Sequence, residues 1–247
     1  MLIVEDLYKS FATAQGPLPV LRGVNLRLDA GASLALMGES GSGKSTLLHV
    51  IAGLESPDGG RVLVDGEPLH VRGEAGLAQW RRTGIGLIFQ QYDLIGSLDV
   101  SSNMSFQARL AGRHDPAWVA HLTERLGLPA LLSRYPEQLS GGQQQRVAIG
   151  RALAARPALV LADEPTGSLD EASGDAVLDL LLELVRDAGS GLLMVTHSGR
   201  LAARLSRRLT LHLGQVCDDS AAPQDHRGAP DYTAGRTAAG AASDGPQ

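Results

Sequence analysis

The sequence has 247 residues, of which 43% are hydrophobic and 20% charged, an ordinary composition for a globular protein with a full-sized core. Its formal net charge is -5, which excludes an overall electrostatic attraction to nucleic acid or to an anionic membrane surface. One cysteine, Cys217, excludes an internal disulfide and a zinc site of the Cys-x-x-Cys type, and fits a reducing, cytosolic compartment.

The sequence offers no obvious route into a membrane. Its N-terminal residues lack the pattern of a signal peptide, since Glu5 and Asp6 stand where a positively charged and then apolar segment is required. The longest apolar runs are about as long as a strand, far below the roughly 20 residues that a membrane helix needs. If the protein works at a membrane, we expect a partner to supply the spanning part.

The first part of the chain predicts an antiparallel sheet. Residues 24–28 alternate apolar and polar side chains, as does a strand with one solvent-exposed face. Residues 62–64 lie between glycine-containing turns at 59–60 and 65–66, which indicates a hairpin strand. We expect this sheet to pack beside a second one.

Short apolar runs without alternation follow along the chain, as in strands that are buried on both faces of a parallel sheet. They are residues 33–37, 85–89, 158–162 and 191–195. Helical patterns lie between them. The clearest begins after Asp170, a good N-cap, and carries an apolar stripe from Val177 to Val185. Alternating strands and helices indicate an α/β fold.

Two segments depart from this alternation. Between about residues 92 and 139 the strand signal is absent, and we predict a small helical insert with helices near 101–111 and 116–127. Residues 218–247 contain almost no large apolar side chain, so they cannot offset the entropy of ordering. We therefore expect one ordered domain over 1–217 that contains the insert, followed by a disordered tail.

A phosphate-binding loop follows the first apolar run. Residues 38–46 fit the pattern G-x-x-x-x-G-K-[ST], in which glycines let backbone N–H groups wrap around a phosphate chain at a helix N-terminus. Lys44 can bridge the outer phosphates, and the Ser45 hydroxyl can bind Mg²⁺. The alternative is a glycine-rich surface turn. The candidate nucleotide-binding residues in this loop are Gly38, Ser40, Gly41, Ser42, Gly43, Lys44, Ser45 and Thr46.

Two adjacent acids stand at the end of the third apolar run. Asp163 can hold Mg²⁺, directly or through its water shell, and Glu164 points the other way and can polarise an attacking water. An apolar strand followed by two acids is by itself a weak signal. Together with the phosphate loop it predicts a site that transfers a phosphoryl group to water.

A second helix start carries exposed glycines. Ser140 is a good N-cap and Gln143 stands three residues later, which makes a capping box. Gly141 and Gly142 leave this helix end bare, so that an anion can approach its free N–H groups. The residues alone leave two interpretations open, a second anion site and a simple capped helix.

These segments together resemble the ATP-binding-cassette (ABC) ATPase family. The resemblance rests on residues 38–46, LSGGQ at 139–143, LADEP at 161–165 and residues 168–170, and it runs in the family's order from about Met1 to Val216. It implies a P-loop NTPase (RecA-like) core with a mostly parallel sheet, an N-terminal antiparallel β subdomain and a small helical subdomain. It also implies ATP hydrolysis, with ATP and Mg²⁺ as the bound species.

The resemblance also implies roles for residues around the nucleotide. Phe11 stands where the family stacks an aromatic ring on adenine, with Tyr8 nearby but out of register. The signature residues Ser140, Gly141, Gly142 and Gln143 match a segment that closes on ATP held by the other subunit. Asp170 matches a loop that crosses the dimer interface.

Further roles at the hydrolysis site follow in the same way. Gln90 matches the residue that reaches Mg²⁺ and the attacking water, with the adjoining Gln91 as the alternative. His197 matches the switch residue that contacts the γ-phosphate, although a single histidine at a strand end usually has no function. The candidate catalytic residues are therefore Glu164, His197 and Gln90, and the candidate metal ligands are Ser45, Gln90 and Asp163.

The expected partners are a second copy of the chain, in a head-to-tail dimer, and integral-membrane transporter subunits at the cytoplasmic face of the cell (inner) membrane. We expect no nucleic acid partner. By resemblance, coupling helices of the membrane subunits dock on the helical insert. A DNA-repair, chromosome-structure or ribosome-acting ABC ATPase is disfavoured by the short insert, the single cysteine and the single cassette.

The subfamily is indicated by finer resemblance. A long loop at 14–20, together with residues 135–153 and 161–170, resembles the lipoprotein-release and macrolide-export type of ATPase subunit. The alternatives are an importer subunit and a regulatory ATPase that signals across the membrane without moving cargo. The cargo itself is not encoded in this chain, because none of its residues is expected to contact cargo.

Overall fold

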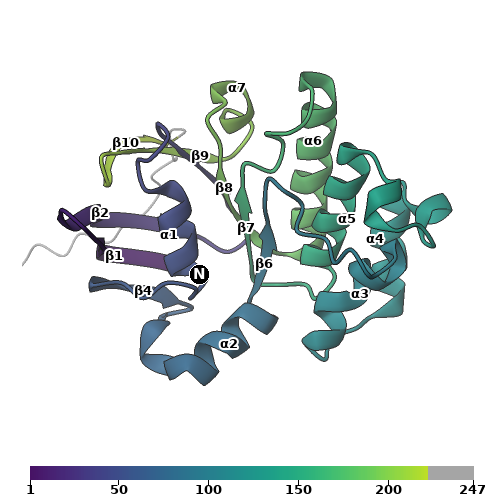
Figure 1. Ribbon diagram of the computed structural model, residues 1–247, viewed down its shortest axis with the longest axis horizontal. Coiled ribbons are helices and arrows are strands. Elements are labelled where there is room, and N and C mark those ends of the chain that lie inside the picture. The colour runs from purple at the N-terminus through teal and green to yellow at the C-terminus, as the bar shows by residue number, and fades with distance from the viewer. Residues whose placement is uncertain (222–247) are drawn as a thin grey trace, which may run out of the picture.

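The computed structural model describes residues 1–221, which form two sheets and their covering helices (Figure 1). The smaller sheet is antiparallel, with the strand order β2-β1-β4-β5. Its strands are β1 (Leu2–Thr13), β2 (Gly16–Leu28), β4 (Gly59–Val64) and β5 (Glu67–Pro68). Val24, Leu26 and Leu28 are buried, as their alternation predicts. The predicted antiparallel sheet is confirmed.

The larger sheet has the strand order β10-β9-β3-β8-β7-β6, and only the β9–β10 pair is antiparallel. Its strands are β3 (Ser33–Met37), β6 (Ile85–Ile88), β7 (Leu159–Asp163), β8 (Gly191–Val195), β9 (Arg207–His212) and β10 (Gln215–Ala221). Each of the four apolar runs in the sequence is one of its parallel strands. The mostly parallel core sheet is therefore confirmed.

Two hydrophobic cores lie on the two faces of the larger sheet. In β3, Leu34 and Leu36 join the core that is shared with the antiparallel sheet and with α1 (Lys44–Ile51), whereas Ala35 faces the other core. That second core is completed by α5 (Gly141–Leu153) and α6 (Glu171–Ala188). Side chains that alternate between two apolar environments explain why these strands are continuously hydrophobic.

Apart from the two helices of the insert, the other helices of the described residues are α2 (Gly73–Thr83), α7 (Gly199–Ala202) and the 3₁₀ helices η1 (His70–Arg72), η2 (Pro129–Leu131) and η3 (Pro136–Gln138). Among the described residues, no helix has the length and apolar character needed to cross a membrane.

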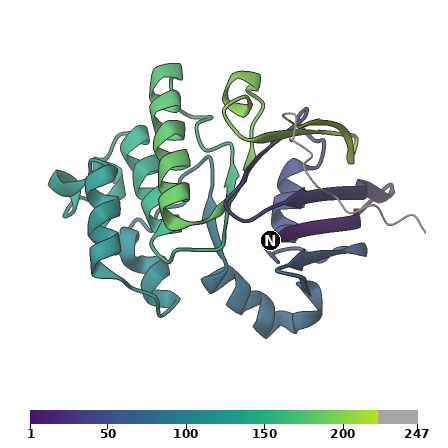
Figure 2. The same ribbon diagram turned by 180° about the vertical axis from the view of Figure 1, so that it is seen from behind.

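The predicted helical insert lies at the end of the molecule opposite the antiparallel sheet (Figures 1 and 2). It contains α3 (Val100–Leu110) and α4 (Pro116–Arg125), close to the two predicted helices. The insert packs on α5, where a Cβ at Gly150 would lie 2.1 Å from Met104 Sδ. This close approach fixes the insert to the helix that begins with the signature residues.

Two boundaries differ from the sequence-based expectation. The expected loop at 14–20 is mostly strand, because residues 16–19 pair with β1 and leave only a tight turn at Ala14 and Gln15. The expected tail begins at residue 218, whereas β10 continues to Ala221 and pairs with β9. Backbone hydrogen bonds to a neighbouring strand do not require apolar side chains, which is why composition misplaced this boundary. The rest of the expected tail, 222–247, lies outside the described residues.

Candidate active site

A cavity of about 460 Å³ opens at the carboxyl ends of β3, β7 and β8. In parallel α/β sheets this edge is where ligands bind, because strand ends and helix N-termini converge there. The cavity is lined by Val20, Gly38, Ser40, Gly41, Gly43, Lys44, Ser45, Thr46, Asp163, Glu164, Val195 and His197. The phosphate loop, the acid pair and the predicted switch histidine therefore share one pocket.

Two glycines of the phosphate loop are required by geometry. Gly38 has a φ of 144°, and a Cβ there would lie 2.2 Å from the Leu211 carbonyl oxygen. Gly43 has a φ of 108°, and its Cβ would lie 3.0 Å from the Val20 carbonyl oxygen. A side chain at either position would push the loop off its support, so the loop has this shape only with glycine.

The loop presents positive charge and free donors to the cavity. Lys44 is buried, and its ammonium donates to the carbonyl oxygens of Gly38, at 2.8 Å, and Glu39, at 2.7 Å. α1 begins here without a side-chain cap, so its first N–H groups remain open. The buried Ser42 hydroxyl also lacks a hydrogen-bond partner within residues 1–221. A phosphate chain matches all three features.

Glu164 adopts an unusual backbone conformation just after β7, with a φ of 44°. Its N–H donates to the Val195 carbonyl oxygen at 3.0 Å, and its carboxylate lies 3.1 Å from His197 Nδ1. Two of the three predicted catalytic side chains, Glu164 and His197, are thus in direct contact. A positive φ at a non-glycine residue costs energy, and such residues cluster at functional sites.

Gln90 and Glu164 both lie next to Gly167, which places the Gln90 amide near the Glu164 carboxylate. A Cβ at Gly167 would lie 3.0 Å from Gln90 Nε2 and 3.2 Å from Glu164 Oε2, so the amide and the carboxylate flank the same glycine. This placement favours Gln90 over Gln91 as the residue near the acid. Sequence reasoning missed Gly167, Val20 and Val195, since a glycine or valine without a motif carries no chemical signal.

The signature residues lie elsewhere. Ser140 caps α5 and forms the predicted capping box with Gln143, with a distance of 2.9 Å from Ser140 N to Gln143 Oε1. None of residues 140–143 lines the cavity. Phe11 also lies outside the lining, on β1, half-exposed, with the Lys9 ammonium 5.1 Å from the centre of its ring.

Asp170 is the N-cap of α6, as predicted, and accepts a hydrogen bond from Ser173 N at 3.0 Å. Hydrogen bonds from the side chain and backbone of Ser173 lower the pKa of this exposed carboxyl. Because the carboxylate is thereby favoured, Asp170 carries its charge at any physiological pH.

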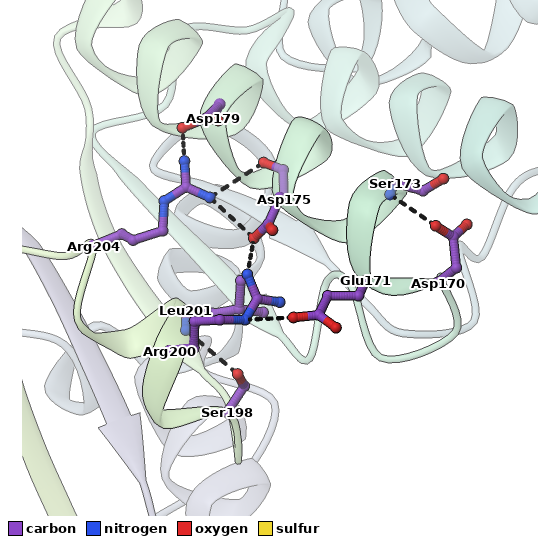
Figure 3. Close-up of polar contacts among 9 residues, drawn as sticks. All are labelled: Asp170, Glu171, Ser173, Asp175, Asp179, Ser198, Arg200, Leu201 and Arg204. Carbon is purple, nitrogen blue, oxygen red and sulfur yellow. Dashed lines mark hydrogen bonds and ion pairs between the residues drawn. The ribbon is translucent and has the colours of Figure 1, made fainter.

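An ion-pair network joins α6 to α7, the helix that follows His197 (Figure 3). Arg200 pairs with Glu171, at 3.1 Å, and with Asp175. Arg204 pairs with Asp175, at 3.2 Å, and with Asp179. The loop that carries His197 and the helix capped by Asp170 therefore rest on a common support.

Comparison with known protein families gives a consistent match. The family of ABC transporters matches residues 21–167, which is more than half of the chain. The ABC transporter ATP-binding protein YbbA of Escherichia coli K12 is 44% identical over 220 residues, 88% of this chain and 96% of its own length. The lipoprotein-releasing system ATP-binding protein LolD of Shewanella denitrificans is 43% identical over 217 residues, 87% of this chain and 93% of its own. The methionine import ATP-binding protein MetN of Caulobacter vibrioides is 42% identical over 225 residues, 90% of this chain and 67% of its own.

Solved structures agree with these relatives. The ATP-binding cassette MJ0796, in a dimeric post-hydrolysis state bound to ADP and Pi, superposes with a TM-score of 0.82 at 33% identity. The match covers 90% of this chain and 98% of that one. From its sequence, its fold and its phosphate loop, the chain belongs to the ABC transporter family, as an ATP-binding subunit with the ATPase activity of that family.

Proposed function

We propose that two copies of this chain close head to tail on ATP, and that this closure powers separate membrane subunits. The observation that carries the proposal is the composition of the cavity, which contains the phosphate loop and Glu164 but none of residues 140–143. A second copy can supply the missing segment. The dimeric state of the related cassette MJ0796, bound to ADP and Pi, supports this arrangement.

The phosphate chain of ATP would lie along the loop, with Lys44 exchanging its two carbonyl contacts for phosphate oxygens. Phe11 would contact the adenine ring, because it is an exposed aromatic on the strand next to β2, whose Val20 lines the cavity. A stacked ring adds apolar contact without a requirement for hydrogen bonds.

Mg²⁺ would be held by Ser45, Asp163 and Gln90. A hydroxyl, a carboxylate and an amide oxygen form the hard oxygen donor set that this ion prefers, and Ser45 and Asp163 line the same cavity. Within residues 1–221 no group of three or more acidic, histidine or cysteine side chains forms a metal cluster. Phosphate oxygens and water would therefore complete the coordination. When bound, the ion neutralises charge on the outer phosphates.

Hydrolysis requires a positioned water and a stabilised γ-phosphate. Glu164 would orient and polarise the water, and His197, already 3.1 Å from that carboxylate, would contact the γ-phosphate. The signature residues of the second copy would add the N–H groups at the start of α5. Loss of the γ-phosphate removes the ligand shared by the two copies, so the pair opens.

The membrane subunits would dock on a groove of about 430 Å³ between α2 and α3, here called the docking groove. It is lined by Ala78, Arg81, Arg82, Ile85, Leu87, Phe89, Gln107, Leu110, Arg151 and Ala152. Leu110 of this lining is exposed, as is Phe106 on the same helix, and Phe89 directly precedes Gln90. Such a mixed apolar and basic groove suits a short amphipathic helix of a membrane protein, at the cytoplasmic face of the inner membrane.

The export type of complex is favoured by the similarity to LolD, a lipoprotein-releasing system protein, over most of both chains. Import remains the second candidate, because the methionine import protein MetN is almost as similar. Purification of the native complex with its membrane subunit, followed by mass spectrometry, distinguishes the two. An extracytoplasmic domain on that subunit supports export, and a co-purified binding protein supports import.

The decisive test of the dimer uses Glu164→Gln, which removes the base while leaving the phosphate loop intact. We expect this variant to form a stable dimer with MgATP on size-exclusion chromatography with light scattering, because ATP stays bound uncleaved. The double variant Lys44→Ala/Glu164→Gln is the control and should remain monomeric. A monomeric Glu164→Gln protein at saturating MgATP would contradict the proposal.

A further inference from the structure

Tyr92 lies two residues after Gln90 and contacts segments that are far apart in the sequence. Its backbone has a φ of 61°, which is rare for a large side chain. Its hydroxyl lies 2.8 Å from Ser168 Oγ, on the loop that leads to Asp170. Ser168 Oγ in turn lies 3.5 Å from the Gln90 carbonyl oxygen. The side chain therefore links the segment after β6 to the loop after β7.

The same hydroxyl lies against the signature. A Cβ at Gly141 would be 2.7 Å from the Tyr92 hydroxyl oxygen, closer than a real Cβ approaches any neighbour. A Cβ at Gly142 would meet only Leu169 Cδ2, at 3.9 Å, which is ordinary contact. The two adjacent glycines thus differ in the space available for a side chain, and of the two only Gly141 is packed directly against Tyr92.

Arg151 holds the backbone of this segment from the other side. Its guanidinium donates to the carbonyl oxygens of Tyr92, at 3.2 Å, and Asp93, at 2.6 Å. Burial lowers the pKa of Arg151, but an arginine remains charged at any physiological pH. Arg151 belongs to α5, the helix that begins with the signature, and it also lines the docking groove.

Tyr92 is thereby fixed to α5 through its backbone and to the Ser168 loop through its hydroxyl. The signature is proposed to act on nucleotide bound to the second copy, and the loop that ends at Asp170 is expected to cross the dimer interface. The distance between them must be correct when the pair closes, because small displacements of positioning groups cost large factors in rate.

We propose that Tyr92 is a positioning residue, whose hydroxyl sets the spacing between the signature at Gly141 and the Ser168–Asp170 loop so that both reach the second copy together. The inference rests on the proposed head-to-tail dimer. A purely structural role for Tyr92 predicts lower stability only. The positioning role predicts weaker closure and slower turnover at unchanged nucleotide binding by each single chain.

The test compares Tyr92→Phe, Ser168→Ala and the double variant, each also in the Glu164→Gln background. Tyr92→Phe keeps the ring and removes only the hydroxyl. We expect the dimer dissociation constant with MgATP to rise roughly tenfold, because each of the two chains would have to order on closure a spacing that the hydrogen bond already fixes in the free chain. The ATPase kcat should fall by a similar factor, while the affinity of the monomer for a fluorescent ATP analogue stays unchanged.

The double variant and a rescue make the result specific. Ser168→Ala should have little further effect once Tyr92→Phe is present, because both remove the 2.8 Å hydrogen bond and the remaining contact of Ser168 with the Gln90 carbonyl is long, at 3.5 Å. Ser168→Thr, which keeps a hydroxyl, should restore dimer affinity to that of the parent. Additive effects of the two substitutions, or an unchanged dissociation constant for Tyr92→Phe, would overturn the inference.

The two proposals fail in different ways. If Glu164→Gln with an intact Tyr92 does not dimerise, the head-to-tail proposal is wrong and the positioning role falls with it. If that parent dimerises and the Tyr92→Phe form dimerises equally well, only the positioning role is wrong.

Discussion

The glycines of the phosphate loop differ in what their neighbours allow. A Cβ at Gly38 would overlap the Leu211 carbonyl oxygen, at 2.2 Å, whereas a Cβ at Gly41 would have nothing within 4 Å. Both have positive φ, 144° and 78°. Position 38 therefore combines backbone strain with a steric clash, and position 41 carries strain alone.

We expect Gly38→Ala to lower the free energy of unfolding by about 2 kcal/mol or more and to abolish ATP binding, because the loop must move off β9. The matched control Gly41→Ala should cost about 1 kcal/mol, from the strained φ alone. Urea denaturation and binding of a fluorescent ATP analogue measure both effects. Equal losses for the two variants would show that the contact with Leu211 is unimportant.

At this scale the sequence predicted residues that belong to fixed motifs. The phosphate loop, Asp163 and Glu164 lie at one cavity because each follows directly from the end of a buried strand, and their roles there stay predictions. The contact between Glu164 and His197, and every contact of Tyr92, could not be predicted. Those distances depend on how separate loops pack against one another, and the spacing of residues along the sequence does not reveal that packing.

The ion-pair network between α6 and α7 shows how the position of one helix relative to another is stabilised. α7 is too short to be stable on its own, so its position depends on the burial of Leu201 and Ala202 and on the ion-pair network that includes Arg200 (Figure 3). Isolated surface ion pairs contribute little, but in a network one ordered side chain serves several partners. These contacts also support the loop that carries His197, which directly precedes α7.

We expect Arg204→Gln to lower the free energy of unfolding by about 1 kcal/mol at low salt, since Asp179 loses its partner and Asp175 keeps only one of its two arginines. Most of that loss should disappear in about 1 M NaCl, where the Debye length falls to about 3 Å and solvent-exposed ion pairs contribute little. Arg27→Gln, which removes a single exposed pair with Asp29, is the control and should change stability little. A loss at Arg204 that is independent of salt would assign the effect to packing.

Element types followed from the sequence better than element ends. The capping residues Ser140 and Asp170 were predicted, because a cap is a local arrangement of a side chain and nearby N–H groups. The extension of β2 to Gly16 and of β10 to Ala221 was not, because each depends on a partner strand. Backbone hydrogen bonds between strands do not depend on the hydrophobicity of the side chains, whereas the strand ends predicted from the sequence were based on hydrophobicity.

One edge of the larger sheet is formed by β10, which within that sheet pairs only with β9. We expect a chain ending at Ala221 to melt at the same temperature as the full chain. A chain ending at residue 217 should melt about 2–4 °C lower, because it loses the ladder to residues 207–210 and exposes the edge of β9. Differential scanning calorimetry of the two truncations decides this. Equal melting temperatures would show that residues 218–221 contribute no stability.

The absence of residues 140–143 from the lining of the cavity has a genetic consequence. A variant with an inactivated phosphate loop still has an intact signature, and a variant with an inactivated signature still has an intact phosphate loop. When both are expressed in one cell, every mixed pair would assemble one complete pocket in the proposed head-to-tail dimer. Two alleles that are each inactive should therefore complement one another when co-expressed, whereas either allele expressed alone should give an inactive protein.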